Sequence, residues 1–349
     1  MTKSVQVGRV RIGGGAPVSI QSMTNTDTRD AQSTANQIRA LADAGCELVR
    51  VSVYDEECVR AARSIVDASP VPLIADVHFR ADLAVGAIES GFAKLRINPG
   101  NIGGEANIRR VADCAKAYGI PIRVGVNSGS LDKKLLTTHG HPTPEALVES
   151  ALDSVRMLER AGFDGIVVAV KTSSVRDTID AYRLLSKQCD YPLHIGVTEA
   201  GLPEDGSIKS AVALGALLAD GIGDTLRVSL SGDPVPEVQA GLQILRALGL
   251  RDGVDVIACP TCGRACIDVT AVARQVKDAL DSKEYAGIGN LRVAVMGCVV
   301  NGPGEAREAD IGIAGAPDGA ALFVKGEPPV PVRGDPAQVL IEAITRRWR

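Results

Sequence analysis

Aromatic residues are scarce in this chain of 349 residues: Phe, Tyr and Trp together make up 3% of it, with a single Trp. The sequence has no run of about 18 apolar residues, so it does not predict a transmembrane helix. Residues 1–15 lack the apolar core of a signal peptide, and we therefore expect a cytoplasmic protein. Basic residues are not in excess, because 38 Lys and Arg stand against 42 Asp and Glu; this argues against a general nucleic-acid or membrane-surface binder.

Glycine and small apolar residues are plentiful instead. The chain has 37 Gly, and 45% of its residues are hydrophobic, a composition that suits buried strands joined by tight turns. It also has eight Cys. Disulfides are disfavoured in a reducing cytoplasm, so a metal or redox role is the better interpretation of at least some of them.

One unit, a β-rich run followed by a polar turn and a helix-period segment, repeats eight times between residues 17 and 248. The expected strands are 17–23, 47–53, 72–77, 93–97, 121–126, 165–170, 192–197 and 224–230. This arithmetic favours a closed barrel over a doubly wound sheet. We therefore predict an α/β protein with a (β/α)8 TIM barrel in residues 1–250.

The pattern changes after Gly249. Strands are expected at 254–258 and 291–296, with a helix between them, and two more strands at 309–315 and 321–326 precede a last helix at 335–348. Residues 251–349 are thus predicted to form a smaller α/β domain.

Polar residues interrupt the apolar barrel strands near their carboxyl ends, where barrel enzymes place their active sites. They are Arg50, Asp76, His78, Arg96, Asn98, Arg123, Asn127, Lys171, His194, Glu199, Arg227 and Ser229. Any one of them has about an even chance of being merely structural, but burying the whole set without a ligand would be very costly. The five Arg and Lys residues predict a phosphate or diphosphate site, because Arg binds phosphate oxygens in bidentate fashion. The Gly-rich loop 97–105 is weaker evidence for the same site.

Four residues of this set are candidates for proton transfer: Asp76, His78, His194 and Glu199. The other two histidines, His139 and His141, lie in a polar loop and are expected to be solvated.

The cysteines fall into two groups. Four are scattered through the barrel and are interpreted as small buried hydrophobes: Cys46, Cys58, Cys114 and Cys189. The other four follow strands of the second domain, with Cys259 and Cys262 in a C-P-T-C motif, then Cys266, and Cys298 after the next strand. Four thiolates are able to hold zinc or an iron–sulfur cluster. Alternatively three of them bind and Glu305 supplies the fourth ligand; the spacing does not choose between Cys266 and Glu305.

Several long motifs resemble those of the 4-hydroxy-3-methylbut-2-enyl diphosphate synthase family. They are CPTCGR (259–264), GCVVNGPGEA (297–306), RINPGNIG (96–103), TEAG (198–201) and GIGDTLRVSL (221–230). The resemblance runs over nearly the whole chain, and it implies a two-electron reductive ring opening of 2-C-methyl-D-erythritol 2,4-cyclodiphosphate that expels water. It also implies a [4Fe–4S] cluster, ferredoxin or flavodoxin as electron donor, and a homodimer.

The resemblance assigns roles residue by residue. The cluster ligands are Cys259, Cys262, Cys298 and Glu305, while Cys266 departs from the family pattern and is expected to be a bystander. The substrate-binding residues are Arg50, Arg96, Asn98, Arg123, Asn127, Lys171, Arg227 and Ser229, to which we add His194 and Arg264. Glu199 is the expected proton donor, and Asp76 and His78 are expected to help position the substrate.

Two other functions fit parts of the pattern. A non-redox hydro-lyase would use a [4Fe–4S] cluster as a Lewis acid on a phosphorylated small molecule, and would turn over without a reductant. A zinc ribbon that binds nucleic acid is disfavoured by the net charge of -4 and by the few aromatics.

Overall fold

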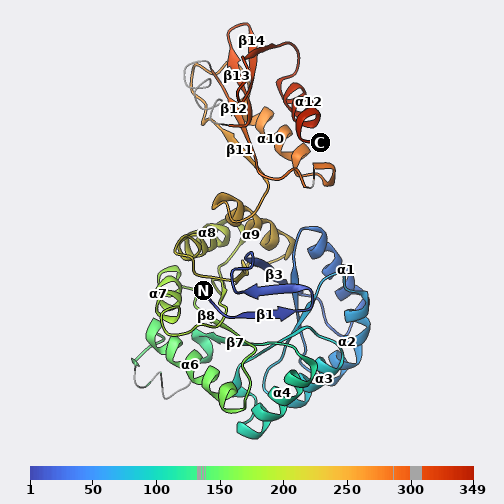
Figure 1. Cartoon of the computed structure of the whole chain (residues 1–349), viewed down its shortest axis with the longest axis vertical. Helices are drawn as coiled ribbons and strands as arrows, with labels where there is room; N and C mark the ends of the chain where they lie inside the picture. Colours follow the sequence, from blue (N-terminus) through green and yellow to red (C-terminus); the bar gives the residue numbers. More distant parts are fainter. Residues whose placement is uncertain (132–134, 136, 138, 286, 299–308) are drawn as a thin grey trace. The chain divides into compact units, whose positions relative to one another are not determined.

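The computed structural model describes residues 1–131, 135, 137, 139–285, 287–298 and 309–349. It divides into two compact units, Met1–Leu250 and Arg251–Arg349 (Figure 1). Each unit has a large hydrophobic core of its own. Within the described residues, the structure contains no helix that is both long and apolar enough to span a membrane.

The first unit is built around a sheet that, in the described chain, has eight parallel strands in the order β8-β7-β6-β5-β4-β3-β10-β9. A bridge between Val168 of β8 and Leu193, next to β9, closes it into a barrel. The strands are β3 (Ser19–Met23), β4 (Leu48–Ser52), β5 (Leu73–Asp76), β6 (Lys94–Ile97), β7 (Ile122–Asn127), β8 (Ile166–Lys171), β9 (His194–Ile195) and β10 (Thr225–Leu226). The predicted TIM barrel is confirmed.

The last two barrel strands are shorter than predicted. β9 and β10 have two residues each, where the sequence suggested six and seven. The backbones of the two segments approach closely just beyond, since a Cβ on Gly196 would lie 2.6 Å from the Arg227 carbonyl oxygen. One further bond, from the Arg227 N–H to the Ile195 carbonyl at 3.0 Å, continues the pairing.

Helices surround the barrel and bury their apolar sides against the strands (Figure 1). They are α1 (Ala31–Asp43), α2 (Glu56–Ala68), α3 (Ala81–Glu89), α4 (Glu105–Tyr118), α6 (Pro144–Arg160), α7 (Val175–Leu185), α8 (Pro203–Ala219) and α9 (Val235–Ala247). Side chains cap several of them: Asp30, Asp55, Thr143 and Ser174 each accept a hydrogen bond from a backbone N–H in the first turn. Short 3-10 turns η1 (Pro99–Asn101) and η2 (Ser128–Ser130) follow β6 and β7.

An N-terminal hairpin that was not predicted from the sequence covers one end of the barrel (Figure 1). It consists of β1 (Ser4–Val7) and β2 (Val10–Gly13). Its apolar side chains, such as Ile12, pack against Leu48, Ile74 and Val167 from the barrel strands. Gly8 and Gly13 lie against Pro72 and Pro192, which precede strands, so the hairpin closes the end where the strands begin.

The second unit contains a five-stranded sheet, as far as the structure describes it, in the order β11-β12-β13-β14-β15. The strands are β11 (Val254–Ala258), β12 (Leu291–Met296), β13 (Ile311–Ala316), β14 (Gly319–Val324) and β15 (Val330–Val332). The first three are parallel and the last two antiparallel. Helices α10 (Val269–Leu280) and α12 (Pro336–Trp348) cover one face, and the short turn η3 (Lys283–Tyr285) follows α10. The predicted strands and the two helices are present, and β15 is additional.

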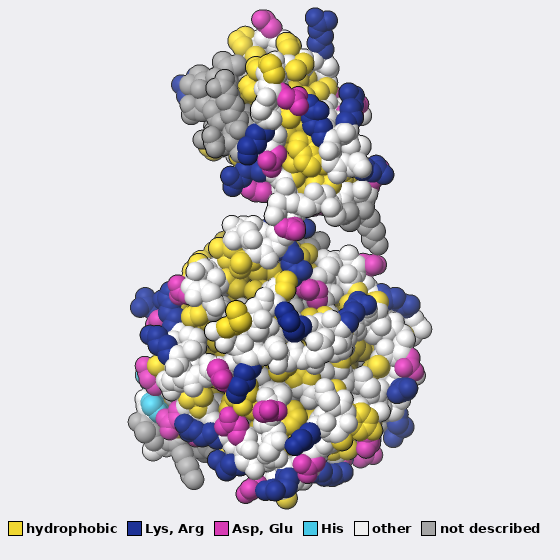
Figure 2. Space-filling model, in the orientation of Figure 1, with side chains coloured by type: hydrophobic (Ala, Val, Ile, Leu, Met, Phe, Trp, Pro, Cys, Tyr) yellow, Lys and Arg dark blue, Asp and Glu magenta, His cyan; other side chains and the backbone are white. Residues whose placement is uncertain are grey.

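The surface of the barrel unit carries mixed charges, but hydrophobic side chains gather over α8 (Figure 2). Leu202, Ile208 and Val212 are exposed there to between 54% and 66%. Exposed apolar groups of this size in one place are typical of a contact surface.

Candidate active site

A cavity of about 230 Å³ lies at the carboxyl ends of the barrel strands. Its walls come from seven barrel strands or the residues directly after them. The lining residues are Arg50, Asp76, His78, Arg96, Arg123, Gly125, Asn127, Ala169, Lys171, Thr198, Arg227 and Ser229. Nine of these twelve were singled out from the sequence, so the polar residues of distant strands do converge on one pocket.

Strand register explains the convergence. Cα partners run from Arg50 to Ile74, from Asp76 to Arg96, and from Arg96 to Arg123, so inward side chains of neighbouring strands follow one another around the barrel in stacked layers. Small residues on other strands leave room for the long cations. A Cβ on Gly125 would lie 2.8 Å from Arg96 Nε, and one on Gly196 would lie 2.6 Å from Lys171 Nζ.

Asp76 is the one carboxylate among the described lining residues of the pocket. Its Oδ1 accepts a hydrogen bond from Arg96 Nη1 at 3.0 Å and lies 3.6 Å from His78 Nε2, and its Oδ2 lies 3.9 Å from Arg50 Nε. Burial by itself raises the pKa of Asp76. The charge of Arg50, the hydrogen bond with His78 and the charge of Arg96 outweigh burial and hold that pKa far below its usual value of 3.8.

Arg227 is held by a carboxylate outside the pocket. Glu237 of α9, which is 3% exposed, accepts hydrogen bonds from Arg227 Nε and Nη2, both at 3.1 Å. It also accepts from Ser22 Oγ at 2.9 Å and from the Leu230 N–H at 3.0 Å. This fork fixes the direction of the guanidinium. Glu237 was not predicted from the sequence; its signal is an acid on the apolar face of a helix, next to Val238 and Gly241.

Of the other three cations of the pocket, Arg123 and Lys171 are buried and Arg50 is partly buried, and Asp76 is the one carboxylate in the described lining around them. Burial lowers the pKa of Arg50 to about 10, although the charge of Asp76 opposes this. Burial, together with the charges of neighbouring arginines, lowers the pKa values of Arg123 and Lys171 well below their usual ranges. Arg123 Nε and Nη1 have no hydrogen-bond partner in the described structure. A pocket with this imbalance is suited to an anion that bears more than one charge.

Three predicted site residues of the barrel do not line the cavity. His194 is fully buried, and its Nε2 lies 3.1 Å from Lys171 Nζ. Asn98 Oδ1 accepts a hydrogen bond from the Gly100 N–H at 3.1 Å and so shapes the loop after β6. Glu199 is exposed beside the lining residue Thr198, and its φ of 52° is a strained value for a residue with a Cβ.

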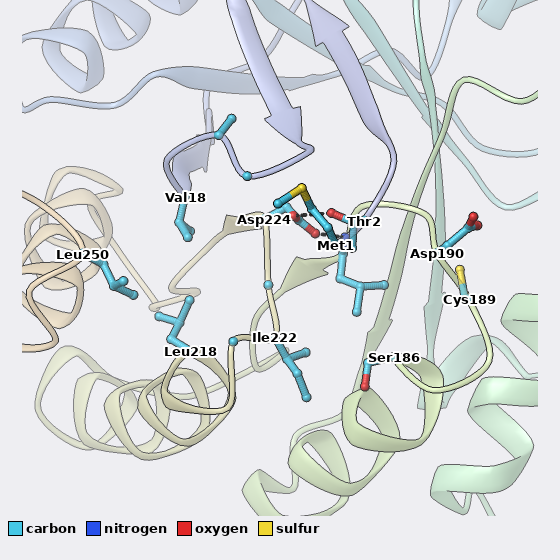
Figure 3. Close-up of a pocket in the computed structure, with 15 residues that line it drawn as sticks. Met1, Thr2, Val18, Ser186, Cys189, Asp190, Leu218, Ile222, Asp224 and Leu250 are labelled. Atoms are coloured by element: carbon cyan, nitrogen blue, oxygen red, sulfur yellow. Dashed lines mark hydrogen bonds between the residues drawn. The ribbon is translucent and has the colours of Figure 1, made fainter.

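A larger cavity of about 440 Å³ lies where strands β3, β9 and β10 begin, next to the N-terminal residues (Figure 3). Its lining includes Met1, Thr2, Val18, Leu218, Ile222 and Asp224. The carboxylate of Asp224 is occupied internally, since it accepts hydrogen bonds from Thr2 Oγ1 at 2.7 Å and from the Leu193 N–H at 2.8 Å. Its described lining has no Lys, Arg or His side chain, in contrast to the pocket at the carboxyl ends of the strands.

In the second unit, parallel pairing of β11 and β12 brings the cysteine motifs together, as predicted. Ala258 pairs with Val295, and the Cys259 N–H donates to the Val295 carbonyl at 3.2 Å. The Gly297 N–H donates to Cys259 Sγ at 3.2 Å, and the Cys266 N–H donates to the Gly297 carbonyl at 2.7 Å. The C-P-T-C loop therefore lies against the backbone that carries Cys298.

The thiols of this loop are accessible, and their chemistry suits a metal. Cys262 and Cys266 are exposed, and Cys259 and Cys298 are half-buried. Arg264, which stands between Cys262 and Cys266 in the sequence, is also exposed. Within the described residues, His, Cys, Asp and Glu side chains do not form a group of three or more in a metal-binding arrangement. Glu305 lies outside the described residues, so the four-ligand set remains a prediction.

Comparison with known proteins covers both units. Residues 2–242 match the GcpE TIM-barrel domain, and residues 255–347 match the GcpE protein C-terminal domain. A protein of Caldanaerobacter subterraneus named 4-hydroxy-3-methylbut-2-en-1-yl diphosphate synthase (flavodoxin) is 55% identical over 94% of this chain and 91% of its own length. A protein of the same name from Geobacter sulfurreducens is 56% identical over 93% of this chain and 92% of its own length.

Solved structures show the barrel fold more widely. The dihydropteroate synthase of Xanthomonas albilineans covers 71% of this chain and 99% of its own, with a TM-score of 0.51 at 14% identity. A truncated 3-deoxy-D-arabino-heptulosonate 7-phosphate synthase from Thermotoga maritima covers 71% of this chain and 94% of its own, with a TM-score of 0.52 at 13% identity. At these identities the likeness concerns the fold alone.

Proposed function

Since this chain belongs to the GcpE family of 4-hydroxy-3-methylbut-2-en-1-yl diphosphate synthases and is an oxidoreductase of isoprenoid biosynthesis, we propose that its barrel pocket holds the diphosphate of the substrate. The reaction is the reductive ring opening of 2-C-methyl-D-erythritol 2,4-cyclodiphosphate to (E)-4-hydroxy-3-methylbut-2-enyl diphosphate. Two electrons enter, the ring C–O bond to phosphate breaks, and a hydroxyl leaves as water.

The observation that carries the pocket assignment is its uncompensated positive charge. Five cations line the described cavity, and Asp76 is the carboxylate among them. The diphosphate would accept charge-assisted hydrogen bonds from Arg50, Arg96, Arg123, Lys171 and Arg227, helped by Asn127 and Ser229. Asn98 contributes through the shape of the loop after β6, and His194 through its contact with Lys171. Such fixed cations orient the substrate and exclude competing water.

Proton transfer is assigned to the rim. Glu199 is the proposed donor to the leaving hydroxyl, because it is exposed at the rim next to Thr198 and its backbone is held in a strained conformation. Asp76 stays ionised, so it is not proposed as an acid. It positions Arg96 and His78 by charge and hydrogen bonding.

The proposed cofactor is a [4Fe–4S] cluster held by Cys259, Cys262, Cys298 and Glu305. Its support is the donor chemistry of the loop: Cys259 and Cys298 follow two paired parallel strands, and the Gly297 N–H, next to Cys298, donates to Cys259 Sγ. When bound, the cluster supplies single electrons and an iron that acts as a Lewis acid toward the leaving hydroxyl. The exposed Arg264, directly after the C-P-T-C motif, is proposed to balance negative charge there.

The electron donor is proposed to be reduced flavodoxin rather than ferredoxin, because the names of the relatives include flavodoxin. We further propose a cytoplasmic homodimer. The exposed apolar side chains at α8 give a second copy of the chain a surface to pack on. Size-exclusion chromatography with light scattering tests the dimer.

The experiment for the reaction is anaerobic purification followed by iron and sulfide analysis and an assay on the cyclic diphosphate with reduced flavodoxin. About four irons per chain and reductant-dependent product are expected. Product formed without reductant would favour the hydro-lyase instead. Zinc without iron would contradict the redox mechanism.

A matched pair of cysteine variants tests the ligand set. Cys298→Ser is expected to lose the cluster, whereas Cys266→Ser is expected to keep iron content and activity near those of the unmodified enzyme. Loss of iron in Cys266→Ser together with its retention in Glu305→Ala would replace Glu305 by Cys266 as the fourth ligand.

A further inference from the structure

Lys94 is a fully buried lysine inside the barrel that has no role in the site described so far. It lies at the start of β6, two residues before Arg96, so both side chains point to the barrel interior. Its Cα partner on β5 is Ile74, and Leu48 and Val167 belong to the same apolar floor as Ile74. Lys94 Nζ has no hydrogen-bond partner in the described structure.

The layer directly above Lys94 is polar, and several of its buried atoms have no hydrogen-bond partner in the described structure. Strand register places Gln21, Arg123 and His194 there, below Arg50 and Arg96. The buried atoms of this region without a partner are Gln21 Oε1 and Nε2, Arg123 Nε and Nη1, His194 Nδ1, Thr225 Oγ1 and Ser19 Oγ.

Among the residues that the structure describes, every charged or titratable group that faces Lys94 is basic. Arg123 of β7 and Arg50 of β4 act on it electrostatically, and His194 of β9 feels its charge in turn. The other described inward residues of this layer and of the layer above it are uncharged: Leu48, Val167, Thr225, Gln21 and Ile74. Asp76 lies higher and is already paired with Arg96 and Arg50.

Burial, reinforced by the charges of Arg123 and Arg50, therefore holds the pKa of Lys94 well below 10.5. A neutral amine is the form that this environment tolerates, since a buried ammonium would need a counter-charge or several acceptors. An anion with several charges in the pocket above would neutralise the arginines whose charges disfavour the ammonium form of Lys94, and would thereby raise its pKa.

We propose that Lys94 is a positioning residue of the anion site, neutral in the free enzyme and protonated from solvent when a diphosphate enters the pocket above it. This rests on the proposed assignment of the pocket to a diphosphate. The step is a proton transfer to the amine, with no bond made or broken in the ligand. It lets a barrel that folds with an uncharged lysine offer one more positive charge to the bound anion.

The test is calorimetric titration of inorganic pyrophosphate into the full-length enzyme, in buffers of the same pH but different ionisation enthalpy. The slope of the observed enthalpy counts the protons taken up. Lys94→Met is expected to take up about one proton fewer than the unmodified enzyme, because the amine is gone. Ionisation of pyrophosphate itself contributes equally to both proteins and cancels in the difference. Lys116→Met, which removes an exposed lysine of α4, is the control and should behave like the unmodified enzyme.

The affinity gives a second readout. Between pH 7 and 9, binding to the unmodified enzyme should weaken more steeply with pH than binding to Lys94→Met, by up to about tenfold per unit from the one linked proton. Lys94→Met should also melt at the same or a higher temperature, since it replaces an unpartnered amine by an apolar chain of similar length.

The outcomes separate the inference from the proposed function. Pyrophosphate binding with the same proton uptake in both proteins would overturn the role of Lys94 and leave the pocket assignment standing. Absence of pyrophosphate binding in the unmodified enzyme would overturn both. If Lys94→Met fails to fold, Lys94→Gln gives the same comparison.

Discussion

Arg123 shows how function constrains single residues in the barrel. It is 2% exposed on β7, and two of its guanidinium nitrogens have no partner in the described structure. A buried cation in this state costs stability, and this cost supports its proposed role in binding the diphosphate of the substrate. Glu237 is the opposite case, a buried anion whose contacts with Arg227, Ser22 and Leu230 occupy both oxygens.

Arg123→Met should therefore stabilise the free enzyme and weaken anion binding. We expect a melting temperature of the barrel that is higher by a few degrees, since about 1 kcal/mol shifts a domain of this size by roughly 2–4 °C. Pyrophosphate should bind at least about tenfold more weakly, because charge-assisted hydrogen bonds are lost. Calorimetry of unfolding and of binding checks both. Arg109→Met on α4, at an exposed ion pair with Glu105, is the control and should change neither.

Asp76→Asn tests the central carboxylate and gives a pH dependence. Removing the charge leaves Arg50 and Arg96 without their counter-charge, and breaking a buried pair costs about 3–5 kcal/mol at pH 7. The pKa of Asp76 is depressed in the folded state, so the stability it contributes is present above its unfolded value and is lost as the pH falls. The difference in the free energy of unfolding in urea between the unmodified enzyme and Asp76→Asn should thus shrink below about pH 4.

Asp67→Asn provides the comparison for this experiment. Asp67 makes an exposed i,i+4 ion pair with Arg63 at 3.3 Å, and its removal should cost less than about 1 kcal/mol. Equal stabilities of Asp67→Asn and Asp76→Asn at pH 7 would contradict the role given to Asp76.

At the scale of elements, the two ends of the barrel are built differently. At the carboxyl end, glycines make room for cations, as Gly125 does for Arg96. At the other end, the hairpin β1–β2 adds apolar side chains that complete the interior layer of Leu48, Ile74 and Val167. The hairpin therefore stabilises the barrel, and the strand ends carry the residues that are proposed to bind the substrate.

Ile12→Ala on β2 should destabilise the barrel by about 2–5 kcal/mol, because it opens a cavity in this plug. Urea unfolding followed by circular dichroism measures the change. Val10→Ala in the same strand, where the side chain is only half-buried, should cost less. Iron content per folded chain should stay the same in both variants, since Ile12 packs within the barrel unit; a loss of iron in Ile12→Ala would contradict this separation.

At the scale of the whole molecule, the chain consists of two units with separate large cores. The barrel carries the anion pocket, and the second unit carries Cys259, Cys262 and Cys298. The proposed diphosphate and the proposed cluster therefore bind to, and stabilise, different units.

Thermal unfolding should accordingly show two transitions. Pyrophosphate at about 100 times its dissociation constant should stabilise the barrel transition by about 2.7 kcal/mol and leave the other in place. Scanning calorimetry with and without pyrophosphate makes the measurement, and the Arg123→Met protein is the control that should respond less. A single transition shifted as a whole by pyrophosphate would contradict independent units.

Much of the architecture was determined by the sequence alone. Eight alternations of strand and helix pattern predicted the barrel, because buried parallel strands need continuous apolar runs and helices need a 3.6-residue period. The cations in the barrel strands predicted an anion site, because burying several charges without a ligand would be very costly; they are Arg50, Arg96, Arg123, Lys171 and Arg227.

Only the tertiary structure decided how these residues are partnered. In the structure, Arg96 donates a hydrogen bond to Asp76, and Arg227 donates to Glu237. His194 lies 3.1 Å from Lys171, and Lys94 Nζ has no hydrogen-bond partner among the described residues. Lys94 and Arg96 both lie in a strand that the sequence predicts, yet Arg96 donates to Asp76 and Lys94 Nζ has no described partner. This difference depends on the register of the barrel strands. Register is set by the closure of the whole sheet, so the depth of a side chain in the barrel, and with it the cost of its charge, is a property that no local stretch of sequence contains.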